Sequence, residues 1–286
     1  MIDPGELRSR RTPFVVATVV RVQRPTSAKP GDCALVLPDG TVEGFVGGAC
    51  AESTVRAQGL RLLDGGEPVL LRITPVAGSE ETRAEGLVTV RNPCLSGGAL
   101  DIFLEPMLPP VLVRVFGDTP VARALVRLGH ELGYEVEATT DPDGVLPADL
   151  GAVVVASQGQ SEEPVLTAAL ASDVPYIALV ASRRRGAAVL DRLDLGEDQR
   201  ARVRTPAGLD IGARTAAEIA LSVYAEIVAQ RPRRGVQAVT AVDPVCRMTV
   251  AVTACTSSAQ HGGRPVYFCG AGCRQAFLDD PAGYPA

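Results

Sequence analysis

The sequence is poor in the side chains on which several classes of function depend. It has no tryptophan, 4% aromatic residues and two histidines among 286 residues. So few aromatic rings argue against a base-stacking surface for nucleic acid, and a net charge of −5 argues against a bulk electrostatic partnership with it. With so little histidine, no Ser/His/Asp set is apparent. We therefore predict no catalytic residue.

The sequence also lacks long apolar runs and an evident leader. No run approaches the ~20 apolar residues of a membrane-spanning helix, and the start, MIDPGELRSRRTPF, does not have the layout of a signal peptide. We therefore expect a cytoplasmic protein. In that compartment the seven cysteines are expected to be thiols or metal ligands rather than disulfides.

Residues 1–107 are expected to form a small, sheet-rich α+β domain. The β-branched run at 14–23 predicts a strand, and alternating residues around Pro38-Asp39-Gly40 predict a hairpin. The segment 49–63 changes to a helical period and ends before Gly65-Gly66. Further strands are predicted at 68–74, 86–90 and 98–106.

Residues 108–232 are predicted to form a Rossmann-like domain. Runs rich in Val, Ile and Leu, such as VLVRVF, GAVVVAS and PYIALVAS, alternate with helical segments, of which the longest is 215–230. This alternation is typical of a parallel sheet covered on both faces, so the fold class is α/β. A Pro/Gly-punctuated linker at 233–240 and a small Cys-rich module at 241–286 complete the predicted organisation.

The first turn of the predicted Rossmann-like domain resembles a degraded nucleotide loop. FGDTPVARAL keeps Gly117, a candidate cofactor contact, but has Thr119 at the second glycine of G-x-G-x-x-G/A. A side chain there obstructs a pyrophosphate, although Asp141 stands where a ribose-binding acid is expected. We favour a domain without NAD, with any ligand at the carboxyl ends of the strands. An NAD(P)-binding oxidoreductase is the alternative.

Three further stretches carry candidate cofactor-binding residues. Cys50 follows a Gly-Gly turn at a predicted helix start, with Glu52 in the first turn, and Cys94 lies in a second glycine-flanked loop. Glycines let a large ligand approach a thiol, although buried structural cysteines are the alternative. Arg183 and Arg184, in SRRRG after a predicted strand, are candidates for phosphate binding, the alternative being a solvated loop.

Four motifs together resemble the XdhC/CoxI family over about residues 12–232. They are GFVGGACAEST, PCLSGGALDIFLEP, ALASDVPYIALVASRRR and PAGLDIGARTAAEIALSVYAEIVAQR. The family matures xanthine dehydrogenase and carbon monoxide dehydrogenase, so the resemblance implies a non-catalytic accessory protein. The resemblance implies a small N-terminal domain before a Rossmann-like one. It also implies binding of molybdenum cofactor, as molybdopterin or its cytosine dinucleotide, with help in its sulfuration and insertion.

The resemblance also implies partners and site residues. The partners are a molybdenum hydroxylase apoenzyme, a cysteine desulfurase and a second copy of the chain. Cys50, Glu52 and Cys94 match the family's cofactor motifs, and Asp210 lies in the matching GLDIG loop. The sequence departs from the family pattern at GDTPVA and at SQGQ (157–160), which lack a glycine and histidines, so chemistry that uses those groups is in doubt.

The tail carries a predicted metal site. Cys246, Cys269 and Cys273 are spaced C-x22-C-x3-C, and the candidates for a fourth ligand are Met248, Cys255 and His261. Methionine would favour copper(I) and histidine would favour zinc. DPVCRM and YFCGAGC resemble a YHS domain over about 241–284, which implies metal binding. The alternatives are a metal-free thiol core and a chain whose main role is soft-metal handling.

Overall fold

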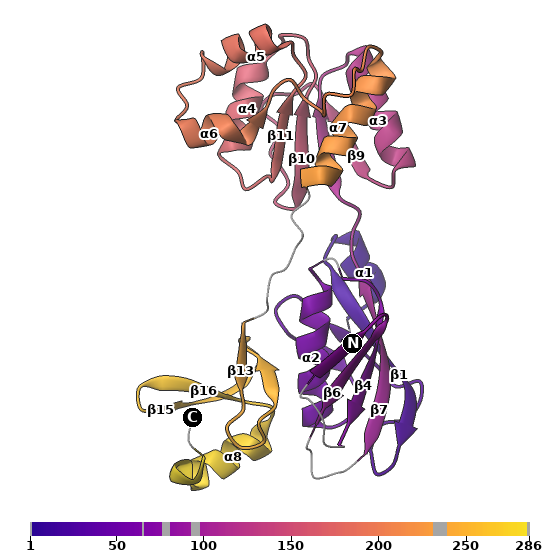
Figure 1. Ribbon diagram of the computed structural model, residues 1–286, viewed down its shortest axis with the longest axis vertical. Helices are drawn as coiled ribbons and strands as arrows, with labels where there is room; N and C mark the ends of the chain where they lie inside the picture. Colours follow the sequence, from indigo (N-terminus) through magenta and orange to yellow (C-terminus); the bar gives the residue numbers. More distant parts are fainter. Residues whose placement is uncertain (1, 65, 76–80, 93–97, 231–238, 285–286) are drawn as a thin grey trace. The chain divides into compact units, whose positions relative to one another are not determined.

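The computed structural model describes residues 2–64, 66–75, 81–92, 98–230 and 239–284 (Figure 1). It forms two compact units, Met1–Pro109 with Arg234–Ala286 and Pro110–Arg233. The predicted linker falls mainly on 231–238, outside the described residues, as does Cys94. Among the helices described, none combines the length and apolarity needed to cross a membrane.

The first unit is built on a seven-stranded sheet in the order β3-β2-β1-β7-β4-β6-β5, antiparallel except between β4 and β6. Residues of β4 alternate in burial and place Val69, Leu71 and Ile73 in the core, against which Ala51 and Val55 of helix α2 pack. The elements are α1 (Pro4–Ser9), β1 (Phe14–Gln23), β2 (Cys33–Val36), β3 (Val42–Gly44), α2 (Ala49–Leu62), β4 (Val69–Thr74), β5 (Glu81–Ala84), β6 (Leu87–Arg91) and β7 (Ala99–Met107).

The second unit is a parallel sheet in the order β12-β11-β10-β8-β9. Helices α3 and α7 cover one face and α4 and α5 the other (Figure 1). The elements are β8 (Leu112–Phe116), α3 (Pro120–Glu131), β9 (Glu135–Thr139), β10 (Leu150–Val155), α4 (Glu162–Leu170), β11 (Tyr176–Leu179), α5 (Arg183–Leu190), α6 (Glu197–Arg202), β12 (Val203–Arg204) and α7 (Ala216–Gln230). The winding direction reverses between β8 and β10, and sheets of this kind bind ligands at the carboxyl ends of such strands.

The C-terminal segment has a very small core of its own. Two antiparallel ribbons and helix α8 bury two small clusters, one of Val266, Phe268 and Phe277 and one of Met248, Val250 and Cys269. The elements are β13 (Thr240–Val242), β14 (Thr249–Ala251), β15 (Ser257–His261), β16 (Arg264–Phe268), α8 (Ala271–Asp279) and a 3-10 turn, Pro281–Gly283. Modules with so little core usually need a further constraint, such as a metal or packing against a larger domain.

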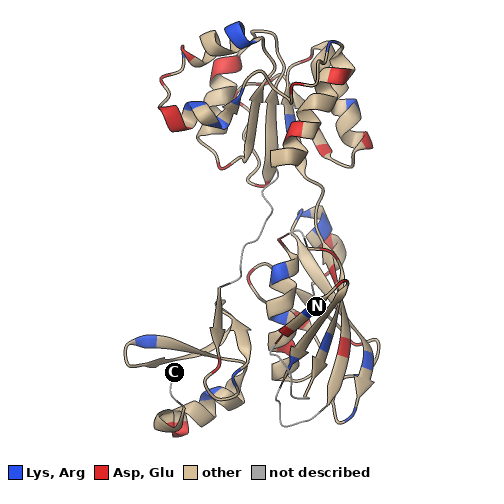
Figure 2. Cartoon of the chain, viewed as in Figure 1, with Lys and Arg blue, Asp and Glu red and all other residues tan. Residues whose placement is uncertain are grey.

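The predicted fold class is confirmed, with one local difference. A sheet-rich unit, a Rossmann-like parallel sheet and a C-terminal cysteine cluster are all present. The basic run after β11, for which we considered a solvated loop, is instead the first turn of α5, because the Ser182 side chain caps its amides and Val189 and Leu190 anchor it in the core. Acidic and basic residues are interspersed over both units in Figure 2.

Candidate functional sites

A cavity of about 750 Å³ opens at the carboxyl ends of the parallel strands in the second unit. Its walls come from the segments that follow β8, β10, β11 and β12, and these segments include Thr119, Gln158, Ser182, Arg183 and Leu209. This is the place where a doubly wound sheet forms its crevice, and the volume falls in the usual range for a small-molecule site.

Two predicted cofactor-binding residues lie on the wall of this cavity. Arg183 and Asp210 both line it, and the Arg183 guanidinium lies 3.8 Å from the Asp210 carboxylate. Both side chains are more than four-fifths exposed, so this ion pair is weak and the guanidinium is available to a ligand. Arg184 is exposed and is not among the lining residues.

Thr119, at the second glycine position of the turn, makes structural hydrogen bonds within the protein. The Thr119 hydroxyl donates a hydrogen bond to the Ala156 carbonyl at 2.7 Å and accepts one from the Ala122 amide at 3.1 Å. Thr119 therefore caps α3 and ties it to the end of β10. Gly117 has a φ of +117°, and a Cβ there would lie 2.6 Å from the Ala156 oxygen, so this turn requires glycine.

A buried ion pair occupies the neighbouring helix start. The Glu162 carboxylate, almost fully buried, accepts hydrogen bonds from the Gly159 amide and from Arg185 Nη1 at 2.9 and 2.8 Å. Arg185 also donates to the Val180 carbonyl. Arg185 is therefore committed to the structure, which leaves Arg183 as the cation of the SRRRG run that both lines the cavity and is well exposed.

The loop carrying Asp210 is held in place by hydrogen bonds to Glu226 of α7. Its carboxylate accepts hydrogen bonds from the Tyr176 hydroxyl at 2.7 Å and from the Gly208 amide at 2.9 Å. Burial, followed by this hydrogen bond, raises the pKa of Tyr176, so the phenol stays a donor. Sequence reasoning missed Glu226, although a glutamate inside an apolar helix is a recognisable signal of a buried polar contact.

The second candidate site is a cluster of thiols in the first unit. Cys269 Sγ lies 3.7 Å from Cys246 Sγ, 3.5 Å from Cys273 Sγ and 3.9 Å from Cys50 Sγ. The structure thus brings together the three cysteines predicted as metal ligands in the tail, and adds Cys50, which was predicted for another role. Cys50 and Cys273 lie in the first turns of α2 and α8, where the helix dipole favours negative charge.

Asp243 organises the tail cysteines and was not anticipated. Its carboxylate is fully buried and lies within 4.8 Å of the three tail thiols. One oxygen accepts hydrogen bonds from the amides of Val245 and Cys246, and the other accepts one from the Cys269 amide at 2.8 Å. The signal in the sequence was DPVC, since an aspartate often accepts from amides two and three residues later.

The thiols of this cluster compete for their protons. A hydrogen bond with Cys269 lowers the pKa of Cys246, against the opposing effect of burial. Hydrogen bonds with Cys246 and Cys50, and then burial, raise the pKa of Cys269, and burial raises the pKa of Cys273 to about 12. Neighbouring thiolates repel, so a cation among the sulfurs would favour further deprotonation.

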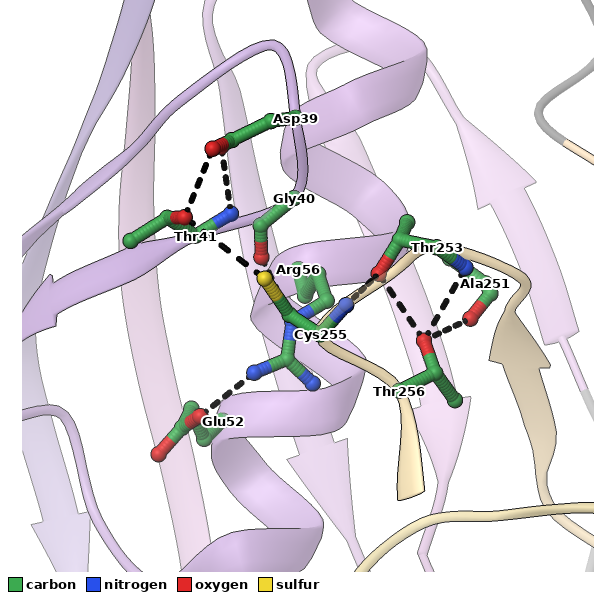
Figure 3. A network of polar contacts seen from close by, with 9 residues as sticks. All are labelled: Asp39, Gly40, Thr41, Glu52, Arg56, Ala251, Thr253, Cys255 and Thr256. Atoms are coloured by element: carbon green, nitrogen blue, oxygen red, sulfur yellow. Dashed lines mark hydrogen bonds and ion pairs between the residues drawn. The ribbon is translucent and has the colours of Figure 1, made fainter. Parts of the chain in front are cut away.

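The other predicted residues lie around this cluster rather than in it. Met248 is buried against Cys269 in the same apolar cluster, whereas His261 stacks edge-on against Phe277 with ring centroids 5.3 Å apart. Cys255 Sγ lies 3.6 Å from Thr41 Oγ1 (Figure 3). The Glu52 carboxylate pairs with Arg56 at 2.6 Å.

Comparisons with known proteins match both the front and the middle of the chain. A family model described as the XdhC and CoxI family matches residues 7–74, and one described as the XdhC Rossmann domain matches residues 113–227. The Escherichia coli K12 molybdenum cofactor insertion chaperone PaoD is 23% identical over 264 residues, 76% of this chain and 83% of PaoD.

Two further similarities extend the comparison. The uncharacterized Escherichia coli K12 protein YqeB is 27% identical over 255 residues, and the match covers 79% of this chain but only 45% of YqeB. A solved structure described as a xanthine dehydrogenase from Bacillus halodurans is 16% identical, with a TM-score of 0.38, and the match covers 79% of this chain and 94% of that one.

Proposed function

Because this chain belongs to the XdhC and CoxI family, we propose that it is a maturation factor for a molybdenum hydroxylase. In this role it binds molybdenum cofactor, assists its sulfuration and inserts it into an apoenzyme of the xanthine dehydrogenase or carbon monoxide dehydrogenase type. Similarity to PaoD, a molybdenum cofactor insertion chaperone, supports the proposal. A cysteine desulfurase and a second copy of the chain are its proposed further partners.

The cavity of the second unit carries this proposal. Its volume of about 750 Å³ suits a pterin with its phosphate. The exposed Arg183 guanidinium and the Ser182 hydroxyl at the start of α5 supply donors for the phosphate, and Asp210 is an acceptor for pterin N–H groups. When bound, the cofactor supplies the redox chemistry of the client enzyme, and the residues of this chain only bind, orient and release it.

Cys50, Glu52 and Cys94 remain predicted contacts on the basis of the family resemblance. Gly117 and Arg184 remain predicted contacts on the basis of the nucleotide-like turn and the basic run. The NAD(P) alternative is disfavoured by Thr119, whose hydroxyl already caps the Ala122 amide at the helix start where a pyrophosphate would bind. Thr119 stands between Asp118 and Pro120, so the described turn has no glycine at or beside that second position.

The proposal is tested by purifying the full chain from a molybdenum-replete host. Elemental analysis should detect molybdenum, and fluorescence should detect pterin, in the same sample. The two should be present in equal amounts, at full or partial occupancy of the chain. Arg183→Ala should weaken cofactor binding at least about tenfold, since a charge-assisted hydrogen bond contributes about 1.5–3 kcal/mol. The matched control is Arg192→Ala, which breaks an exposed ion pair with Glu163 outside the cavity.

Two outcomes would contradict the proposal. One is a wild-type chain that carries neither pterin nor molybdenum and takes up neither when they are added. The other is a client hydroxylase that matures equally well in cells with and without this chain. Calorimetry with NADH on the same sample tests the oxidoreductase alternative, which predicts measurable binding.

A second candidate function is soft-metal handling by the C-terminal module. The observation that favours it is the clustering of Cys246, Cys269 and Cys273 around the buried Asp243. Thiolates select zinc or copper(I) over harder cations. The module would then supply or sense a metal for the client enzyme, and deleting 241–286 should leave cofactor binding in the second unit intact while abolishing metal binding.

A further inference from the structure

We infer that Cys50 of the N-terminal sheet domain is the fourth ligand of the metal site in the C-terminal module. The site would then be a four-thiol centre, Cys50, Cys246, Cys269 and Cys273, that takes a thiophilic cation of tetrahedral preference, in the first place zinc. This inference does not depend on the cofactor role, because it concerns only the geometry within the first unit.

The spacing of the sulfurs supports a single cation. With a Zn–S bond of about 2.3 Å, tetrahedral geometry places ligand sulfurs about 3.8 Å apart. Cys269 Sγ has the other three sulfurs at 3.5, 3.7 and 3.9 Å, and Cys50 is one of the three. These are three of the six edges of such a tetrahedron, and all of them meet at the most buried thiol of the cluster.

The alternative fourth ligands are less suitable. Both oxygens of Asp243 already accept backbone hydrogen bonds from the segments that carry Cys246 and Cys269, so Asp243 positions the ligands. His261 lies in the ribbon of β15 and β16, and its ring packs against Phe277 of α8. Met248 is a thioether buried in the same apolar cluster and offers a weaker ligand than a fourth thiolate.

Glycine residues allow the N-terminal domain and the C-terminal module to pack closely against each other. A Cβ at Gly270, which precedes α8, would lie 2.8 Å from the Ala49 Cβ next to Cys50. A Cβ at Gly40 would lie 2.7 Å from Thr253 of the tail. In Figure 3 the turn at Gly40 is tied to α2 by Arg56, which donates to the Gly40 carbonyl at 2.7 Å, and Thr41 meets Cys255 across the same contact.

The test uses the full-length, reduced, metal-free chain and titrates it with Co²⁺ as a spectroscopic probe, then with Zn²⁺ in competition. Wild type should bind one cation with the visible spectrum of tetrahedral sulfur ligation. Cys50→Ser should weaken binding at least tenfold and change the spectrum, because loss of even an outer-shell partner costs about 10–100-fold. Cys33→Ser, which removes an exposed thiol of β2, is the matched control and should change neither.

A second variant keeps every thiol. Gly270 has an extended backbone, φ −179°, so Gly270→Leu introduces no backbone strain but wedges α8 away from Ala49. This variant should weaken cation binding, as Cys50→Ser does. Protection of Cys50 from alkylation, read by mass spectrometry in wild type with and without Zn²⁺, tests the same contact without any substitution.

The inference is overturned if Cys50→Ser binds Zn²⁺ and Co²⁺ with wild-type affinity and spectrum, or if Zn²⁺ leaves alkylation of Cys50 unchanged. It is equally overturned if the wild-type chain binds only copper(I), with an affinity that Cys50→Ser does not alter. The role of the second-unit cavity in cofactor binding is measured separately through Arg183→Ala, so a failure of one proposal is distinguishable from a failure of the other.

Discussion

Asp101 shows how a single buried carboxylate can organise one face of a sheet. It lies on β7, almost fully buried, and accepts hydrogen bonds from Arg72 at 2.9 and 3.3 Å, with Arg21 at 2.8 Å on the other side. Burial alone would raise the pKa of Asp101, but the hydrogen bond and charge of Arg72, together with Arg21, outweigh it and leave the pKa below its ordinary value.

A carboxyl whose pKa is depressed by folding contributes stability above its unfolded pKa, about 3.9. That contribution is lost as the pH falls through the folded pKa. We therefore expect the free energy of unfolding of the first unit to decrease on acidification below about pH 4. Asp101→Asn should remove part of that decrease and cost about 1–3 kcal/mol at pH 7.

Chemical denaturation between pH 2.5 and 7 measures both effects. Asp118→Asn is the control, because Asp118 pairs with Arg123 on an exposed surface, and it should cost less than about 1 kcal/mol. If the two variants lose the same free energy at pH 7, the Asp101 network contributes no more than a surface pair.

Individual residues were predictable where their neighbours in sequence determine their surroundings. The helix-terminal position of Cys50 followed from the Gly-Gly turn before it, and the structure starts α2 at Ala49. The approach of Cys50 to Cys269 was not predictable, because 219 positions separate them and no spacing rule relates two segments joined only by tertiary packing. Asp243 was missed for a related reason, since its role depends on the Cys269 amide 26 positions away.

At the scale of elements, the loop between β12 and α7 depends on one side chain for its position. Glu226 accepts hydrogen bonds from Gly208 of the loop and from Tyr176 of β11, and Gly208 itself has a φ of +92°. The loop that carries Asp210 is thereby fixed at the wall of the cavity, although Leu209 and Ile211 are themselves substantially exposed.

Glu226→Ala should destabilise the second unit by about 1–3 kcal/mol, because it leaves buried donors without an acceptor. It should also raise hydrogen exchange across 207–212 and weaken ligand binding in the cavity. Glu226→Gln keeps one acceptor oxygen and should lose less. Denaturation and exchange mass spectrometry measure these effects, with Glu163→Ala of the exposed pair as the control; unchanged exchange at 207–212 would show that the loop is held by other contacts.

Elements with a strong period were predictable, and the basic helix was not. Strand 14–23 and the parallel strands of the second unit follow runs of β-branched and aliphatic residues, and the structure reproduces them. Helix α5 begins with three arginines, whose positive charge opposes the dipole at a helix N-terminus, and with a glycine, which is a weak helix former. Its stability comes from Val189 and Leu190 in the core and from Thr205, against which Gly186 packs closely. Tertiary contacts of this kind cannot be predicted from the local sequence.

At the scale of the whole molecule, the N-terminal sheet domain and the C-terminal module form one compact unit, while the Rossmann-like unit between them in sequence is another. The proposed metal site lies wholly in the first of these units. A ligand that binds only the native state stabilises it by about 2.7 kcal/mol at a hundredfold excess over its dissociation constant.

Removing the metal with a chelator should therefore destabilise only the first unit. We expect faster hydrogen exchange at 240–284 and in the first turn of α2, and unchanged exchange throughout 110–230. Cys50→Ser should lose the response in α2 while keeping some of it in the tail. Equal responses in the two units, or a tail that responds without α2, would contradict the shared site.

Cys50 takes part in two separate proposals. It belongs to the thiol cluster by position, at 3.9 Å from Cys269, and to the cofactor motif by family resemblance alone. If both proposals hold, zinc bound by all four thiols would make the Cys50 sulfur less available to molybdenum. Cofactor loading of the full chain would then fall as its zinc content rises.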